Sequence, residues 1–544
     1  MGLSLTAEQK SILKIFKIEE QYVIPAYQRP YSWGYDHCFQ LYNDLFEAFN
    51  SNEDYFIGNI IIAKSDADKD ILEIIDGQQR IITLLLFIKV LHLLSPELKV
   101  LNQILEQEDW EGNKSRPRIK SDIFEANDEN ELQIVFSLTK KDLENKLQNC
   151  RDRKGNFSER KCNNRFEVNT LYFYDWLTFY KEKNDNIRSF VEFLLKRVYL
   201  LPIELTGKTL DEANEKALVI FETINNRGMN LEDADIFKAK LYKKARKVNE
   251  TDKFIELWKD LKYSTEKLGL GIDDVFRFYS HIIRGKEGIT SSEINLREFF
   301  TAKKYSPFEL KKYSEILDDL FKIIEVLQFY EECKRNNSNI SKWIQIIDIY
   351  TNQYPKFAVV VYFFKNGYDQ QDETTINFLK SLIRYIYYQG STTRVKFEIY
   401  SIIKNVYINK PISKYYYEDI TADYFDYLGR LKYGFALLSF YLKNDVLSNY
   451  HIDKLVSYKD KKYLTDDWKE TQWEEFIDSL GNFIILDIPK RNMTLPQKLD
   501  YFRQKSQLPE VKKISENEFT YQIFKTRDNQ LKQELVNFFK GSKL

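Results

Sequence analysis

The stretch Ile71–Leu94, ILEIIDGQQRIITLLLFIKVLHLL, places a polar cluster between two apolar segments. Ile71–Ile75 is short and rich in β-branched residues, as strands are, whereas Ile81–Leu94 is apolar almost throughout, as a buried helix is. The cluster between them is Asp76-Gly77-Gln78-Gln79-Arg80. The sequence therefore predicts a strand that ends at this cluster and a helix whose free N-terminal N–H groups favour an anion.

Two more polar clusters have a similar setting. Ile24–Trp33, IPAYQRPYSW, follows the predicted extended segment Gln21–Ile24, and Phe221–Gly228, FETINNRG, follows a predicted helix over 212–223. Tyr55–Ile62 and Val198–Leu205 have the composition of further strands. Because polar groups on loops of a rigid scaffold commonly form binding sites, we expect the three clusters to share one pocket.

The charged residues of these clusters suit a polyanion and its metal ion. Guanidinium groups match phosphate oxygens and stay charged at any working pH, which fits Arg29, Arg80 and Arg227. Asp76 can hold Mg²⁺, which takes one or two carboxylates together with waters and phosphate oxygens. A simpler alternative remains, in which Asp76-Gly77 is only a turn and Arg80 pairs with an acid on the surface.

The amides and aromatic rings extend the same interpretation. Gln78 or Gln79 can orient an attacking water or read a base edge. Tyr27, Tyr31 and Trp33 can stack on a base, at about 1–3 kcal/mol each, although core packing is the commoner role of such rings in a chain with 15% aromatic residues.

Composition sets wider limits. With 544 residues, the chain exceeds a usual single core and predicts about three domains. Its 81 Lys and Arg nearly balance 82 Asp and Glu, so nucleic-acid binding must depend on local patches. Four cysteines without a Cys-x-x-Cys pair support neither a zinc knuckle nor a disulfide scaffold, and no run of 18 apolar residues occurs. We expect a cytoplasmic protein that does not span a membrane.

The remaining chain divides by pattern. Residues 7–17 predict a short helix, the polar residues 106–166 predict an insertion over the pocket, and residues 250–440 show aromatic-rich helical periodicity. The last hundred residues predict a strand, a second strand and a helix, over Tyr450–Val456, Asn482–Asp487 and Leu495–Gln504.

The three N-terminal clusters, in this order over about residues 8–245, resemble the N-terminal domain of the GmrSD type IV restriction family. The resemblance implies a ParB/sulfiredoxin-like α+β fold that binds and hydrolyses a nucleoside triphosphate. It also implies a prokaryotic defence protein that attacks modified phage DNA.

Residues 440–540 resemble the nuclease domain of the same family, a ββα His-Me finger of the HNH type. The matching pieces are Ile452-Asp453, Leu480–Leu486, Asn492, Phe502, Lys505 and Arg527. Such a nuclease uses a histidine as general base, an asparagine that orients it, and a metal ligand on the helix.

The nuclease resemblance has one departure, because Asp453 is followed by Lys454 where the family has histidine. A lysine with an ordinary pKa of about 10.4 is a poor base near neutrality. His451 lies three residues earlier, and an odd offset along a strand reverses the face. Loss of cutting is therefore one of the alternatives.

The resemblance implies the following fold and sites. The chain is helix-rich, multidomain α+β, with an NTP-binding domain over 1–248, an α-helical middle domain over 249–440 and an HNH-like domain over 441–544. The catalytic candidates are Asp76, Gln78, Gln79, Arg80, His451, Asp453, Lys454 and Asn482. The nucleotide-binding candidates are Tyr27, Gln28, Arg29, Trp33, Asp76, Arg80, Asn225 and Arg227. The metal-binding candidates are Asp76 and Asn492.

The expected cofactors are an NTP with Mg²⁺ or Mn²⁺, and the expected partner is modified phage DNA, with a homo-oligomer left open. Two alternatives to a restriction nuclease remain. One is a nucleotide-dependent sensor of DNA modification, or a partner-binding protein, whose nuclease domain is inactive. The other is an assembly scaffold, against which saturable nucleotide binding would count.

Overall fold

A glycine in the left-handed region joins the N-terminal sheet to its central helix. In the computed structural model, strand β5 (Ile71–Asp76) is followed by Gly77, whose φ is 90°, and helix α3 (Gln78–Leu94) begins directly afterwards. A Cβ atom at position 77 would lie 2.6 Å from Cγ2 of Ile60. The turn that positions the Asp76–Arg80 cluster therefore requires glycine both for its backbone conformation and for space.

The structure describes most of the chain, which divides into two compact units, Met1–Lys247 and Val248–Leu544. The described residues are 6–108, 115–152, 157–184, 186–210, 212–214, 216–217, 220, 233–301, 306–336, 338–368, 373–389, 392–410, 412, 417–464, 468, 470–516 and 520–541.

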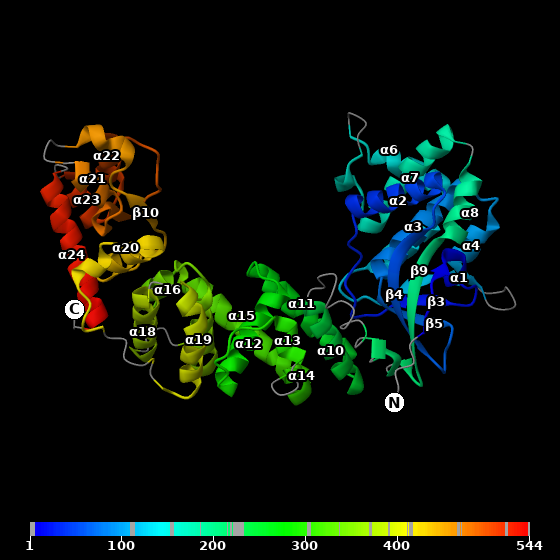
Figure 1. Cartoon of the computed structure of the whole chain (residues 1–544), viewed down its shortest axis with the longest axis horizontal. Coiled ribbons are helices and arrows are strands. Elements are labelled where there is room, and N and C mark those ends of the chain that lie inside the picture. The colour runs from blue at the N-terminus through cyan, green and yellow to red at the C-terminus, as the bar shows by residue number, and fades with distance from the viewer. Residues whose placement is uncertain are drawn as a thin grey trace. The chain divides into compact units, whose positions relative to one another are not determined.

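The first unit contains a mixed sheet covered by helices (Figure 1). Its order is β1-β9-β4-β5-β3-β8, and β2 also pairs with β9. The central pair β4–β9 is parallel over a long register, whereas β5 pairs with β4 in the antiparallel direction and with β3 in the parallel direction. The strands are β1 (Thr6–Ala7), β2 (Lys10–Ser11), β3 (Gln21–Ile24), β4 (Tyr55–Ser65), β8 (Ile119–Ser121) and β9 (Val198–Gly207), and the separate pair β6 (Glu106–Glu108) and β7 (Ser115–Pro117).

Helix α3 lies at the centre of the core of this unit. All but three of its 17 residues are buried, and it packs against α7, with the rings of Phe87 and Phe173 5.1 Å apart. Burial of each large apolar side chain contributes about 1.5–3 kcal/mol, so α3 holds its N-terminus firmly. The other helices are α1 (Ile12–Ile15), α2 (Tyr35–Ser51), α4 (Lys99–Leu105), α5 (Asp128–Ser137), α6 (Lys140–Asn149), α7 (Arg165–Lys183), α8 (Ile187–Arg197) and α10 (Asp233–Lys247).

The second unit is mainly helical and contains a small two-stranded sheet that is followed, among the described residues, by three more helices. Helix α12 packs against α15, α17 and α19, and the two-stranded sheet packs against α20. Its helices are α11 (Thr251–Lys267), α12 (Ile272–Glu287), α13 (Leu296–Thr301), α14 (Pro307–Leu310), α15 (Tyr313–Cys333), α16 (Ser341–Asp348), α17 (Tyr354–Asn366), α18 (Glu373–Gln389), α19 (Thr392–Tyr407), α20 (Lys432–Tyr441), α21 (Glu470–Ile477), α22 (Leu495–Lys505), α23 (Pro509–Glu516) and α24 (Tyr521–Lys540).

The small sheet pairs β10 (His451–Lys454) with β11 (Phe483–Leu486) in the antiparallel direction, and α22 follows β11. The predicted order of strand, strand and helix is therefore present. The prediction of a helix-rich, multidomain α+β chain is also confirmed, whereas the ParB-like and His-Me finger folds stay predictions.

Two expectations about local structure are wrong. Within 7–17 only Ile12–Ile15 is helical, because Lys10 and Ser11 pair with Leu200 and Tyr199 of β9. Residues 106–166 are not merely an insertion, because they contain α5, α6 and strand β8, which extends the main sheet beside β3.

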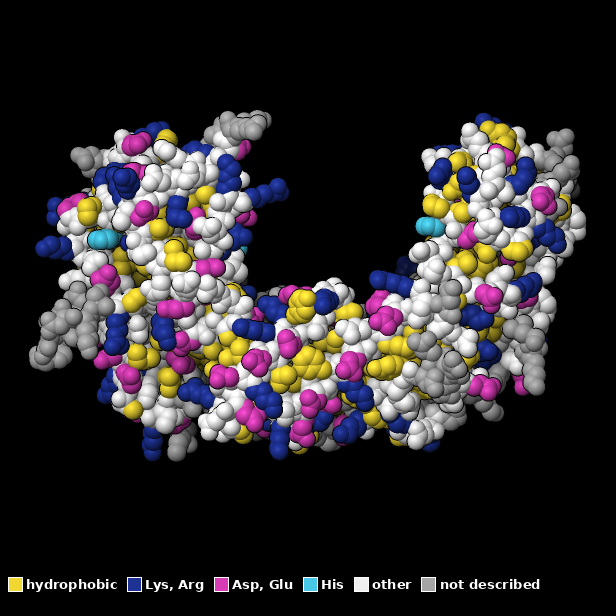
Figure 2. All heavy atoms as spheres, turned by 180° about the vertical axis from the view of Figure 1, so that it is seen from behind, with side chains coloured by type: hydrophobic (Ala, Val, Ile, Leu, Met, Phe, Trp, Pro, Cys, Tyr) yellow, Lys and Arg dark blue, Asp and Glu magenta, His cyan; other side chains and the backbone are white. Residues whose placement is uncertain are grey.

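None of the described helices is long and apolar enough to cross a membrane. On the face drawn in Figure 2, basic and acidic side chains are interspersed over both units. This agrees with the near balance of 81 basic and 82 acidic residues.

We predict that Gly77→Ala destabilises the first unit by about 2–5 kcal/mol. About 1–2 kcal/mol comes from the left-handed backbone, and about 1–3 kcal/mol comes from the contact with Ile60. Chemical denaturation measures the loss. Gly269→Ala is the matched control, because Gly269 has a φ of 68° with no atom within 4 Å of an added Cβ, so it shows the backbone cost alone. Equal losses in the two variants would contradict the steric part of the prediction.

Candidate functional site

The side chain of Gln79 ties the second polar cluster to the first. Its Oε1 accepts hydrogen bonds from the backbone N–H groups of Ser32 (2.9 Å) and Trp33 (3.2 Å), and its Nε2 donates to the carbonyl of Pro30 (3.2 Å). Because Gln79 is buried, loss of these partners would leave several polar groups unsatisfied. The two clusters that the sequence predicts to meet are thus in direct contact.

Neighbouring side chains add to this connection. Nε2 of Gln78 donates to the carbonyl of Arg29 at 3.0 Å, and Nε2 of Gln28 donates to the carbonyl of Ile75 at 2.9 Å. Oε1 of Gln78 is different: it is buried and has no hydrogen-bond partner among the described residues. A buried acceptor without a partner is rare and calls for a donor, a water or a cation.

Arg80 lies beside an irregularity in β4. The register of β4 against β9 shifts between Phe56 and Gly58, and Gly58 has a φ of 136°. A Cβ there would meet Nε of Arg80 at 3.5 Å, while Nη1 of Arg80 donates to the carbonyl of Asn59 at 2.7 Å. One part of the guanidinium group is therefore fixed by the backbone, and no acceptor is present among the described residues for the rest.

A buried polar network supports the loop that carries Trp33. The hydroxyl of Tyr31 lies 2.7 Å from Oγ1 of Thr83, and Nδ2 of Asn169 donates both to this hydroxyl and to the carbonyl of Trp33, each at 2.8 Å. Sequence reasoning missed Asn169, although an asparagine inside the largely apolar helix α7 was a usable signal. Trp33 itself stacks on His37, with ring centroids 5.2 Å apart.

Asp76 lies at the end of β5, immediately before the α3 N-terminus. Burial raises the pKa of its carboxyl above the ordinary value of 3.8, and the guanidinium group of Arg80, the backbone N–H of Gly77 and the guanidinium group of Arg29 oppose this rise only in part. Arg29 and Arg80 are therefore both within electrostatic reach of this carboxyl. The site combines one acid, two cations and a helix N-terminus.

Helix α10 reaches the same loop from a distant part of the sequence. Lys238 is buried, pairs with Glu125, and directs its Nζ at 3.4 Å to the carbonyl of Gln28. The ring of Tyr242 lies 6.0 Å from that of Tyr27, which is buried. The lysines of this helix gave no sequence signal that one of them is buried. The third predicted cluster, with Asn225 and Arg227, lies outside the described residues.

The C-terminal candidates are arranged differently. The carboxylate of Asp453 is buried between Lys490 and Lys498, at 3.1 Å from each, and Nζ of Lys454 lies 2.8 Å from Oδ1 of Asp478. Both predicted catalytic residues are thus occupied by ion pairs.

Asn482 is also fully engaged. Its Oδ1 accepts from the N–H of Val456 at 2.9 Å, and its Nδ2 donates to the carbonyls of Val456 (3.0 Å) and Ile477 (2.9 Å). His451 and Asn492 are exposed, and no contact between them is present in the described part of the chain. The structure therefore brings the N-terminal candidates together more closely than the C-terminal ones.

A thiol cluster was not expected from the sequence. The sulfur atoms of Cys150 and Cys162 lie 3.1 Å apart, and Glu167 completes a group of three potential ligands. The Glu167 carboxylate already accepts from Lys146 at 3.1 Å and Asn163 at 2.8 Å. The ion pair between Lys146 and Glu167 joins α6 to α7.

The N-terminal part of the chain matches a known protein family. Residues 12–242 match the family model described as GmrSD restriction endonuclease, N-terminal domain. Over these residues the chain is similar to that domain, so the expected resemblance of the N-terminal part is confirmed, and the match indicates a restriction-type defence protein. No curated protein matches the chain.

We predict that Asp76→Asn gains stability relative to the wild type as the pH rises. Below the ordinary value of 3.8 the carboxyl is protonated in both the folded and the unfolded chain. As the pH rises through the raised folded pKa, ionisation costs more in the folded state, so the wild type loses stability there. Unfolding free energies of both proteins between about pH 2 and pH 7 test this, because the range must begin below the ordinary carboxyl pKa.

Asp142→Asn provides the control of opposite sign, because its hydrogen bonds to Thr139 hold the pKa of Asp142 below the ordinary value. That variant should become less stable than the wild type as the pH rises. A difference between Asp76→Asn and the wild type that stays constant with pH would contradict the burial argument.

Proposed function

We propose that the first unit binds and hydrolyses a nucleoside triphosphate at the Asp76–Arg80 cluster, within a defence protein that acts on modified phage DNA. The observation that carries this proposal is the unpartnered, buried Oε1 of Gln78. Gln78 is the first residue of α3, two residues after Asp76. A buried oxygen atom without a hydrogen-bond partner, close to a carboxylate and two guanidinium groups, is typical of a ligand-binding site.

The residues present fit a divalent cation. The Asp76 carboxylate and the Gln78 carbonyl oxygen are hard oxygen donors, the type that Mg²⁺ and Mn²⁺ prefer. When bound, such an ion neutralises phosphate charge and activates water.

The other side chains have separate roles in this proposal. Arg29 and Arg80 hold the phosphates, and the N–H groups of the first turn of α3 contribute further donors. Gln78 orients the attacking water. Gln79 keeps the loop in place, because its own amide is already used in three hydrogen bonds. Tyr27 and Trp33 form the walls.

We predict that Asp76→Asn lowers NTP hydrolysis by roughly 100-fold or more, the usual size of a lost acid–base or metal-binding group. The measurement is phosphate release with Mg²⁺ or Mn²⁺, in the presence and absence of modified DNA. Asp68→Asn, an exposed carboxylate in the turn between β4 and β5, is the matched control and should hydrolyse as the wild type does. Unchanged hydrolysis in Asp76→Asn would remove the site.

The C-terminal geometry favours a second candidate function, in which the chain senses modified DNA in a nucleotide-dependent way without cutting it at the HNH-like residues. The supporting observations are the ion pairs of Asp453 and Lys454 and the saturated amide of Asn482. A general base and the asparagine that orients it need lone pairs and N–H groups that are available to the substrate. In these residues most such groups are already used in ion pairs or hydrogen bonds within the protein.

We predict that the full chain binds modified DNA without nicking it. The measurement is conversion of supercoiled plasmid, plain or modified, with NTP and Mg²⁺ or Mn²⁺. Nicking that disappears in both His451→Ala and Asn492→Ala would establish the nuclease and reject the sensor. Nicking that survives both substitutions would place the cutting residues elsewhere.

A further inference from the structure

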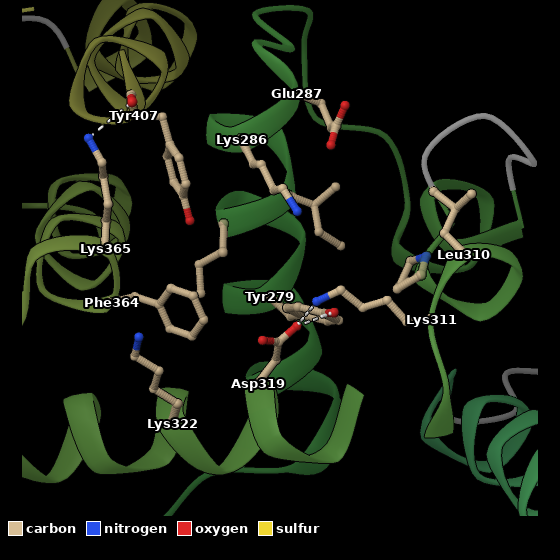
Figure 3. Close-up of a pocket in the computed structure, with 13 residues that line it drawn as sticks. Tyr279, Lys286, Glu287, Leu310, Lys311, Asp319, Lys322, Phe364, Lys365 and Tyr407 are labelled. Atoms are coloured by element: carbon tan, nitrogen blue, oxygen red, sulfur yellow. Dashed lines mark hydrogen bonds and ion pairs between the residues drawn. The ribbon is translucent and has the colours of Figure 1, made fainter. Parts of the chain in front are cut away.

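The second unit contains a cavity of about 470 Å³ between helices α12, α14, α15, α17 and α19 (Figure 3). Its apolar and aromatic lining comes from Tyr279, Ile282 and Ile283 of α12, Phe364 of α17 and Tyr407 of α19. Small-molecule sites commonly have this size and this kind of lining. No residue of the matched family segment, 12–242, contributes to it.

Four lysines surround the cavity, and two of them are satisfied by the protein. Lys311 pairs with Asp319, which also accepts the hydroxyl of Tyr279 at 2.7 Å. Lys365 donates to the last two carbonyls of α19 at 2.7 and 3.0 Å, where a cation is favoured by the helix dipole. These two lysines have structural roles.

Lys286 and Lys322 remain without a charged partner. Neither has a hydrogen bond or ion pair to any described residue, and the second acid of the lining, Glu287, pairs with neither of them. Nζ of Lys322 lies 4.5 Å from the centroid of the Phe364 ring, and Figure 3 shows the Lys286 ammonium group directed into the cavity. Two unpaired cations beside an apolar floor create a local positive potential that attracts an anion.

We propose that this cavity binds a nucleoside 5′-phosphate. Its phosphate is held by Lys286 and Lys322, and its base packs against the aromatic rings of Phe364 and Tyr407. A ligand with only a phosphate leaves the aromatic lining unused, and one with only a ring leaves both cations unpaired. Base–aromatic stacking is sequence-tolerant, so the site reads the class of ligand rather than one base.

The test is isothermal titration of the full chain with 5′-AMP in buffer containing EDTA. We expect binding that weakens at least tenfold in the double variant Lys286→Glu/Lys322→Glu and several-fold in Phe364→Leu. Lys253→Glu is the matched control, because Lys253 is exposed on α11 of the same unit, and it should bind as the wild type does. Wild-type affinity in the double variant, or no binding of 5′-AMP by the wild type, overturns the proposal.

Two further arms separate this site from the N-terminal one and define the ligand. Arg80→Ala should bind 5′-AMP in EDTA as the wild type does; loss of binding in that variant would assign the signal to the N-terminal cluster and overturn the second site. Adenosine and inorganic phosphate should each bind much more weakly than 5′-AMP. Equal affinity for inorganic phosphate would show that the aromatic lining is not used and would also overturn the proposal.

The phosphate can come from a free mononucleotide or from the 5′ end of a DNA strand. Displacement of labelled 5′-AMP by a 5′-phosphorylated oligonucleotide, but not by the same strand with a 5′-hydroxyl, supports the site with a strand end as its ligand. Displacement by mononucleotides alone supports it with a free nucleotide.

Discussion

The amide of Gln79 is the interaction on which the N-terminal site depends. It is the point where the central helix α3 and the loop after β3, separated by 46 residues at Trp33, are joined by three hydrogen bonds. A typical hydrogen bond adds only about 0.5–1.5 kcal/mol, but an unsatisfied buried group costs about 1–3 kcal/mol. The connection therefore matters more for excluding other loop positions than for total stability. Gly77 determines where α3 begins and so where the Gln79 side chain lies. The burial of α3 holds that side chain in position.

The two ends of the chain use similar residue types with different results. Around α3, Gln79 makes three hydrogen bonds, whereas Oε1 of Gln78 and part of the Arg80 guanidinium group have no hydrogen-bond partner among the described residues. Around β10 and β11, the carboxylate of Asp453 has two lysines, and the amide of Asn482 has three backbone partners. Residue identity alone does not distinguish the two clusters, because the number of hydrogen-bonding groups left for a ligand depends on the neighbours that folding brings into contact.

The sequence was most informative where local pattern and final environment agree. The apolar run after Arg80 predicted α3, because a long segment that is apolar on every face is typical of a buried helix. The β-branched segments likewise predicted β4, β5 and β9. The helix expected over 7–17 failed because Lys10 and Ser11 pair with a strand about 190 residues away, which local pattern does not contain. The insertion of Lys238 beneath Gln28 and the approach of Cys150 to Cys162 are hidden for the same reason. The meeting of the first two clusters was predictable as strand-end geometry, but the division of labour between Gln78 and Gln79 depends on side-chain hydrogen bonds that only the folded structure defines.

Under the proposed function, the raised pKa of Asp76 links cation binding to folding. A buried carboxylate whose ionisation opposes folding at neutral pH is a small store of instability at the centre of a well-packed unit. Any cation that settles against it removes this penalty and binds the folded chain in preference to the unfolded one, so it shifts the folding equilibrium by mass action. Under the proposed function, the loop held by Gln79 and the turn at Gly77 would therefore open less often when a cation is bound beside Asp76.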